Sequence, residues 1–213
     1  MSEAILRPAP SGGVPYRIKS NPSSHAPSFL MLHGWSGDEK VMWVLETILP
    51  QAHLLAAPRG PYPLEEGGFQ WSAGPGSLDS PFADFKAGAD AVEAVVDDLV
   101  QRDQLELGQL VLMGFSQGAA VSFTLAARSG FQPRALICLA GFVPKGDTDG
   151  LKDTPVFWGH GSRDELVPVE RAHRDLERLK DSGVDVTYCE ADVGHRLGIE
   201  CTRGLKRWLE QLD

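Results

Sequence analysis

The sequence predicts an α/β fold in which a mostly parallel central sheet carries helices on both faces. Short apolar runs, typical of strands buried on both faces, recur along the chain and alternate with segments of helical pattern. This alternation has the spacing of βαβ units, which favours a parallel sheet. Polar segments rich in glycine follow the apolar runs, at the strand ends where ligands bind in such sheets.

Length and composition favour a single globular domain over residues 1–213, with a loose Pro/Gly/Ser-rich start at residues 1–13. Hydrophobic residues make up 42% of the chain and charged residues 23%, as is usual for globular proteins. Twenty Lys and Arg against 29 Asp and Glu give a formal net charge of −9, with no basic stripe. Nucleic acid is therefore not an expected partner.

The cysteines, the first residues and the apolar stretches together predict the cellular compartment of the protein. Cys138, Cys189 and Cys201 are too few and too scattered to predict a disulfide framework or a zinc site. The first residues lack the pattern of a signal peptide. No apolar stretch approaches the ~20 residues that cross a bilayer, so stable membrane insertion is not expected. Together these features predict a cytoplasmic protein.

Six segments are predicted to be strands. Five are continuous or nearly continuous apolar runs, and the sixth alternates as a half-buried strand does; they are residues 28–32, 53–57, 110–113, 135–140, 155–158 and 184–189. Residues 14–19 are a further candidate, and Pro15 favours an edge position for them because proline lacks the N–H that a central strand donates.

Helices are predicted between these strands. Apolar residues from Phe85 to Leu99 recur on one face of a long amphipathic helix. Other helices are expected at residues 40–49, 117–129, 168–181 and near the C-terminus. The Gly/Pro-rich stretch from Arg59 to Pro81 is a long loop, and its aromatic residues favour a functional role. It is too short to form a full cap domain over the sheet.

The segment Gly114-Phe115-Ser116-Gln117-Gly118 lies between an apolar run and an Ala-rich helical segment. It fits the nucleophile elbow G-x-S-x-G, in which a strained turn holds the serine hydroxyl clear of the sheet. Side chains at positions 114 and 118 would collide with a neighbouring strand or helix, so glycine fits both. The alternative is that Ser116 only caps the helix.

A serine nucleophile needs a base, and α/β hydrolases place Ser, Asp or Glu, and His in that order. His195 follows a late strand, after a glycine, and is therefore the predicted general base; otherwise it is a helix-start histidine that caps or binds water. His33 and His160 lie beside glycines in strand-end turns and are expected to bond loop backbone. The remaining histidines lie in less suitable places: His25, His53 and His173.

Asp164 is the predicted acid because it follows the strand at residues 155–158. The alternative is a surface charge paired with Arg163. Other carboxylates are less well placed by their sequence position: Asp147, Asp149, Glu165 and Asp192. The oxyanion of an acyl-transfer intermediate needs two N–H donors. The backbone amides of Gln117, after the nucleophile, and Trp35, after the strand at residues 28–32, are the expected donors.

Several motifs together resemble the phospholipase/carboxylesterase family of serine α/β-hydrolases, which includes acyl-protein thioesterases and small bacterial carboxylesterases. They are LHGWSGDE at 32–39, GFSQG at 114–118, HGSRDELVPVERA at 160–172 and GH at 194–195. The resemblance runs from about residue 28 onward. It implies the α/β-hydrolase fold, the triad Ser116, Asp164 and His195, and oxyanion donation by Trp35 and Gln117.

The resemblance also bears on substrate binding. It places Leu166 near an acyl pocket and Phe142 beside the site, and Phe69 and Trp71 are included as substrate-binding candidates. Thioesterases of the family usually read HGLGD where this chain has HGWSGD, and Phe69-Gln70-Trp71 resembles the bacterial esterase branch. The family often forms dimers, so a homodimer is an expected assembly.

The sequence thus predicts a carboxylesterase acting on small-molecule esters with short to medium acyl chains through an acyl-enzyme. No metal or organic cofactor is required for that chemistry. Lysophospholipids, thioesters and peptide-like amides stay open as substrates, and an inactive hydrolase fold that serves as a binding module is an alternative of another class. A dinucleotide site is not expected, because HGWSG lacks the G-x-G-x-x-G pattern.

Overall fold

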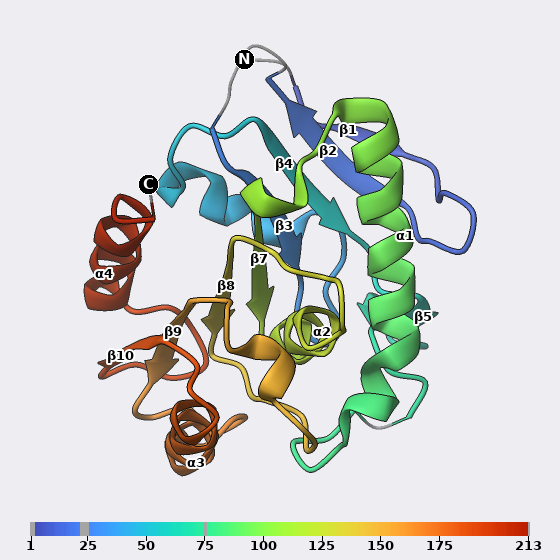
Figure 1. Cartoon of the computed structure of the whole chain (residues 1–213). Helices are drawn as coiled ribbons and strands as arrows, with labels where there is room; N and C mark the ends of the chain where they lie inside the picture. Colours follow the sequence, from blue (N-terminus) through green and yellow to red (C-terminus); the bar gives the residue numbers. More distant parts are fainter. Residues whose placement is uncertain (1–2, 22–25, 75, 213) are drawn as a thin grey trace.

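A computed structural model describes residues 3–21, 26–74 and 76–212. These form a sheet in the order β1-β2-β4-β3-β7-β8-β9-β10 (Figure 1). All neighbours from β4 to β10 pair in parallel, and β2 is antiparallel to both β1 and β4. The mostly parallel sheet is therefore confirmed. Its strands are Ile5–Arg7 (β1), Tyr16–Ser20 (β2), Ser28–Leu32 (β3), Leu54–Pro58 (β4), Leu110–Phe115 (β7), Ala135–Leu139 (β8), Val156–Gly161 (β9) and Val186–Ala191 (β10).

Helices cover both faces of this sheet, as the alternating sequence predicts (Figure 1). The α-helices are Lys86–Asp103 (α1), Gln117–Ala126 (α2), Val169–Asp181 (α3) and Ile199–Leu209 (α4), and the 3₁₀ helices are Val41–Ile48 (η1), Phe82–Phe85 (η2), Leu107–Gln109 (η3) and Asp149–Leu151 (η4). Residues of α1, α2 and α3 pack on one face, and residues of η1 and α4 pack on the other.

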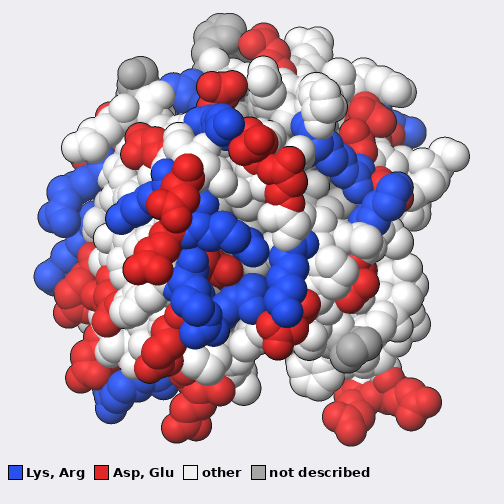
Figure 2. All heavy atoms as spheres, turned by 60° about the horizontal axis from the view of Figure 1, so that its bottom comes forward, with Lys and Arg blue, Asp and Glu red and all other residues white. Residues whose placement is uncertain are grey.

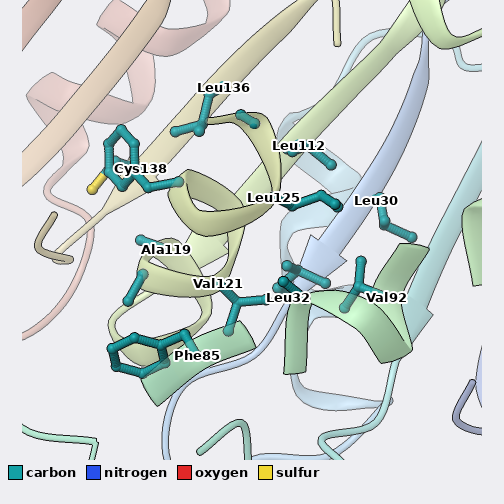
Figure 3. Packing of buried hydrophobic residues seen from close by; sticks show 14 of the residues in the cluster. Leu30, Leu32, Phe85, Val92, Leu112, Ala119, Val121, Leu125, Leu136 and Cys138 are labelled. Carbon is teal, nitrogen blue, oxygen red and sulfur yellow. The ribbon is translucent and has the colours of Figure 1, made fainter. Parts of the chain in front are cut away.

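The core follows from the alternation of side chains along each buried strand. In β3, Leu30 and Leu32 face the cluster under α1 and α2, whereas Phe29 and Met31 face the cluster under α4. Figure 3 shows the first cluster, where Val121 of α2 lies among side chains of the sheet and of α1. Both faces of the sheet are thus apolar, which explains the continuous apolar runs in the sequence.

The N-terminal segment differs from expectation. Residues 5–7 form β1, which pairs with β2 through Ile5 and Ile18, so the described part of residues 1–13 is not uniformly loose; residues 1–2 lie outside the described residues. Arg7 holds the segment against α1 by a two-pronged contact with Asp103. The expected edge position of residues 14–19 was also wrong, because β2 lies between β1 and β4 and Pro15 precedes it.

The long loop after β4 forms a small hairpin of β5 (Tyr62–Pro63) and β6 (Phe69–Gln70). A bridge between Gly37 and Phe69 ties the hairpin to the loop that follows β3. No large cap domain is present among the described residues. The segment 40–49, expected to be helical, forms the 3₁₀ helix η1. None of the helices in the described ranges is long and apolar enough to cross a membrane.

Candidate active site

Ser116 stands at the turn between β7 and α2, with φ of +53° and ψ of −118°. Such a conformation is strained for a residue with a side chain, as expected at a nucleophile elbow. Its amide donates to Leu139 O at 2.9 Å, which fixes the turn to β8. The Ser116 side chain makes no capping hydrogen bond to α2. The geometry therefore favours the elbow over the capping alternative.

The two glycines of the elbow lie against backbone atoms. A Cβ at Gly114 would lie 2.4 Å from the Cα and N of Ala119 in α2. A Cβ at Gly118 would lie 2.2 Å from Leu32 O in β3. Both distances are far below a normal contact, so the expected collision with a neighbouring helix and strand is confirmed.

Replacing Gly114 by alanine should lower the free energy of unfolding by about 1–3 kcal/mol, because the helix and strand must move apart to admit the methyl group. Denaturant unfolding of the purified variant measures this. Gly108→Ala is the matched control, since its Cβ would meet no atom within 4 Å. We expect that control to match or slightly exceed the parent in stability, and equal stability of the two variants would contradict the packing argument.

Asp164 and His195 lie together at the carboxyl edge of the sheet. His195 Nδ1 lies 2.7 Å from Asp164 Oδ2, and the Asp164 side chain is completely buried. The other carboxylate oxygen accepts the amides of Leu166 at 3.0 Å and Val167 at 2.9 Å. The carboxylate is thus an acceptor from three sides, so Nδ1 of His195 carries the proton and donates it. Nε2 is then the ring nitrogen that is able to accept a proton.

The ring of His195 packs against Phe115, the residue before Ser116, with ring centroids 4.9 Å apart. Gly34 also lies against the elbow, since an added Cβ would be 2.9 Å from Phe115 Cδ1 and 3.3 Å from Ser116 Cβ. Among the described residues Ser116 Oγ makes no hydrogen bond with His195. Catalytic hydrogen bonds of this kind are often formed only when substrate is bound.

Two backbone amides at or near the elbow, those of Gln117 and Trp35, were predicted to hold an oxyanion. Gln117 is the first residue of α2, so its N–H has no partner within the helix. In the described chain, the turn and loop hydrogen bonds use neither the Gln117 nor the Trp35 amide as donor. Trp35 follows Gly34, which contacts the elbow, and its side chain is exposed. Both amides thus remain available to an oxyanion.

A buried hydrogen-bond network joins the long loop after β4 to the elbow and to the segment after β3. Trp71 Nε1 donates to His33 O at 2.7 Å, and the Trp71 amide donates to Gln117 Oε1 at 2.9 Å. His33 Nε2 accepts the Gly60 amide at 2.9 Å, so its Nδ1 donates to Gly34 O at 2.7 Å. The long loop is therefore bonded to both segments that carry the Trp35 and Gln117 amides.

His33 and His160 bond loop backbone, as predicted. His160 Nε2 donates to Val167 O at 2.9 Å, and its Nδ1 accepts from Trp158. Burial lowers the pKa of both histidines below the ordinary 6.5. They therefore stay neutral in the fold at a pH where the unfolded chain protonates them.

Below pH 6.5 the unfolded chain binds protons at these two positions that the folded chain does not. The free energy of unfolding should then fall as pH decreases, by up to about 1.4 kcal/mol per pH unit for each histidine. Urea unfolding at about pH 7.5, 6.5 and 5.5 measures the slope. His160→Gln retains an amide donor without a titrating ring and should flatten it. A stability that does not change over this range would contradict the argument.

The four predicted substrate-binding residues are not brought together as one exposed surface. Leu166 is 69% exposed beside Asp164, whereas Phe142 is 2% exposed and packs in the core near Phe85. Trp71 is completely buried, so its contacts are with the loop network and not with open space. Phe69 is half-buried, with the Arg59 guanidinium 4.6 Å from its ring.

Two features of the structure are not predicted by any motif in the sequence. The Val143 amide donates to Asp175 Oδ2 at 2.9 Å, and Arg171 pairs with the same oxygen at 2.8 Å while donating to Val143 O. This buried cluster of α3 fixes the loop after β8, and only the i,i+4 spacing of Arg171 and Asp175 hints at it. The second feature is a disulfide between Cys189 and Cys201, which corrects the expectation of no such framework.

The surface around the strand ends carries charges of both signs. The strand arrows of β7 and β8 point toward the bottom of Figure 1, and Figure 2 brings that end forward. Basic side chains gather near the centre of this view and acidic ones adjoin them. No cluster of three or more His, Cys, Asp or Glu in the described part of the chain is arranged to hold a metal ion.

Fold and site together define an α/β hydrolase with a serine at its nucleophile elbow. The profile of the phospholipase/carboxylesterase family matches residues 16–212, and the chain belongs to that family. It is accordingly an enzyme, a serine hydrolase of the carboxylesterase and acyl-protein thioesterase type.

Known relatives are distant in sequence. Acyl-protein thioesterase 1 of Cryptococcus neoformans is 29% identical over 168 residues, covering 69% of this chain and 67% of that protein. The protein of the same name from Kluyveromyces lactis is 34% identical over 86 residues, which span 36% of its length and 37% of this chain. Putative hydrolase MhqD of Bacillus subtilis is 27% identical over 187 residues, covering 85% of this chain and 92% of that protein.

Solved structures agree on the fold. A carboxylesterase from Mesorhizobium loti superposes with a TM-score of 0.83 at 22% identity, covering 99% of this chain and 100% of that one. A carboxylesterase from Bacillus cereus gives a TM-score of 0.81 at 18% identity over 93% of this chain and 94% of that one. At these identities the likeness establishes the α/β-hydrolase fold alone.

Proposed function

We propose that this protein hydrolyses carboxylic esters of short to medium acyl chain, with Ser116 as nucleophile, His195 as general base and Asp164 as the group that orients the base. The observation that carries the proposal is the geometry at the sheet edge. The strained serine caps nothing, and the residue before it, Phe115, packs against the imidazole of His195, whose Nδ1 donates to a buried carboxylate. That combination is the requirement for activating a serine hydroxyl.

The proposed reaction has two halves. His195 Nε2 takes the proton of Ser116 as Oγ attacks the ester carbonyl, and the amides of Trp35 and Gln117 hold the developing oxyanion. His195 then protonates the leaving alcohol, which departs and leaves an acyl-enzyme. In the second half His195 activates a water molecule, and the acid and Ser116 are released. The imidazolium formed in each half is stabilised by Asp164.

The loop after β4 supports the proposed size of the acyl chain. That loop forms only the β5–β6 hairpin, which is tied down through Gly37 and Phe69, and it holds Trp71 in the core. Trp35, in the loop after β3, and Leu166, in the loop after β9, have exposed side chains. A hairpin this small does not cover a long acyl chain, which favours short and medium acyl groups.

A panel of nitrophenyl esters from acetate to palmitate tests the proposal. We expect kcat/KM to peak at about two to eight acyl carbons, because a hairpin this small encloses little of a longer chain. Covalent labelling by a fluorophosphonate should occur at Ser116, which separates an enzyme from an inactive binding module. A maximum at palmitate would contradict the chain-length proposal, and absence of labelling would contradict the catalytic one.

A thioesterase activity is the second candidate, and the names of the curated relatives favour it. The same serine, base and amides serve a thioester, because the oxyanion intermediate is alike. Matched oxygen and sulfur esters of one acyl chain distinguish the two activities. Lysophospholipids belong in the same comparison. We further propose a cytoplasmic location, which fractionation of the native cell tests.

A further inference from the structure

The disulfide brackets the segment that carries the proposed base. Cys189 lies in β10 and Cys201 lies in α4, with their Cα atoms 5.5 Å apart and a sequence separation of 12. The loop at residues 192–198 joins the two elements, and His195 is at its middle. The bridge therefore closes a covalent ring around the loop on which His195 depends.

The first half of this loop is held by backbone hydrogen bonds. The Ser162 amide donates to Ala191 O at 2.8 Å, and the Arg163 amide donates to Val193 O at 3.0 Å. These bonds tie the loop to the turn after β9, which also carries Asp164. The start of the loop is thus fixed to the sheet without help from the disulfide.

The second half lacks such bonds. Beyond Val193, the backbone hydrogen bonds among the described residues stay within the loop or run into α4, as with the Arg196 amide to Gly194 O and the Thr202 amide to Gly198 O. Leu197 packs over Gly159. The Cys189–Cys201 bridge is accordingly the covalent tie between the start of α4 and the sheet on this side of His195.

The two sulfurs differ in access. Cys189 lines an open cavity of about 410 Å³, together with Glu200 and Arg207, whereas Cys201 is completely buried. A thiol from solution would therefore attack the sulfur of Cys189. The third cysteine, Cys138, is completely buried, and burial raises the pKa of its thiol well above the usual value. It does not compete as a thiolate.

We propose that Cys189–Cys201 is a thiol-exchange site whose redox state sets the position of His195; the inference rests on the proposed role of that histidine. A thiolate such as that of glutathione attacks Cys189 Sγ, forming a mixed disulfide and releasing Cys201 as thiolate, which takes up a proton. A second thiol attacks the mixed disulfide. The protein then holds two thiols, and the two reductant molecules are joined as their disulfide.

Opening the bridge releases residues 194–200 from β10 while the Asp164 contact persists. Nε2 of His195 then samples a wider range of positions relative to Ser116 Oγ. A displacement of this kind lowers the rate of proton transfer but leaves acyl binding unchanged. Because the closed bridge restricts the position of His195, the oxidised form would be the more active one. In a reducing compartment a bridge of this sort forms only under oxidation.

The experiment compares one protein in two states. The enzyme is oxidised with glutathione disulfide or reduced with dithiothreitol, and thiols are titrated in denaturant: one is expected in the oxidised form and three in the reduced form, since the chain has three cysteines. On nitrophenyl butyrate, kcat should fall about tenfold on reduction with KM within about twofold, and reoxidation should restore it. C189S/C201S should have the kcat of the reduced enzyme, and neither glutathione disulfide nor dithiothreitol should change it.

Amide hydrogen exchange over residues 194–200 provides a readout that needs no catalysis. We expect faster exchange in the reduced enzyme and in C189S/C201S, with exchange of β7 unchanged. Equal exchange of this loop in both states overturns the proposal, as does equal kcat in an active enzyme, or failure of glutathione disulfide to close the bridge. Loss of fluorophosphonate labelling in both states would instead count against the proposed esterase, and loop exchange would still decide the redox inference.

Discussion

Replacing Ser116 by alanine should reduce kcat by about 10⁶ while leaving the fold intact. The hydroxyl makes no capping bond with α2, so its removal costs the helix nothing. Alanine still has to adopt the strained backbone of the elbow, and the surrounding contacts of Gly114 and Gly118 maintain that turn. Hydrolysis of nitrophenyl butyrate and thermal unfolding, measured on the same preparation, separate the two effects.

Ser129→Ala is the matched control, because Ser129 is exposed beyond the end of α2. It should retain parental kcat and fluorophosphonate labelling, both of which Ser116→Ala should lose. A Ser116→Ala enzyme with activity above about one part in 10³ of the parent would mean that another group is the nucleophile. The acyl-enzyme mechanism would then have to be abandoned.

The elbow could be predicted because its causes are local. An apolar strand, a serine between two glycines and a small-residue helix are contiguous in sequence, and the collisions that require Gly114 and Gly118 involve the adjoining helix and the neighbouring strand. Asp164 and His195 are far apart in the chain. They could still be paired because parallel strands end at one edge, so residues after β9 and β10 become neighbours.

Other features depend on packing that a sequence pattern does not encode. An aromatic residue in a long loop faces either substrate or core, and Trp71 is buried because its Nε1 finds His33 O beneath the loop. Cys189 and Cys201 meet because a strand, a short loop and a helix fold back on each other. Ile5 joins the sheet because β2 offers a free edge to it. Each outcome is decided by a tertiary contact.

Replacing Asp164 by asparagine should reduce kcat by about 10⁴, the second largest effect expected in this site. The oxygen that accepts the Leu166 and Val167 amides has to remain an oxygen, because two N–H groups face it. The NH₂ of asparagine then takes the place of the oxygen that His195 Nδ1 contacts at 2.7 Å. Nδ1 becomes the acceptor, the proton moves to Nε2, and the ring is no longer able to take the proton of Ser116.

The volume of the side chain hardly changes in this variant, so stability should fall far less than activity. Glu165→Gln is the control, because it neutralises the adjacent exposed carboxylate and should leave kcat within about twofold of the parent. Fluorophosphonate labelling of Asp164→Asn should slow in proportion to kcat, since both reactions begin with the same proton transfer. A loss smaller than about tenfold would mean that Asp164 does not set the tautomer of His195, and that Nε2 is made basic by some other contact.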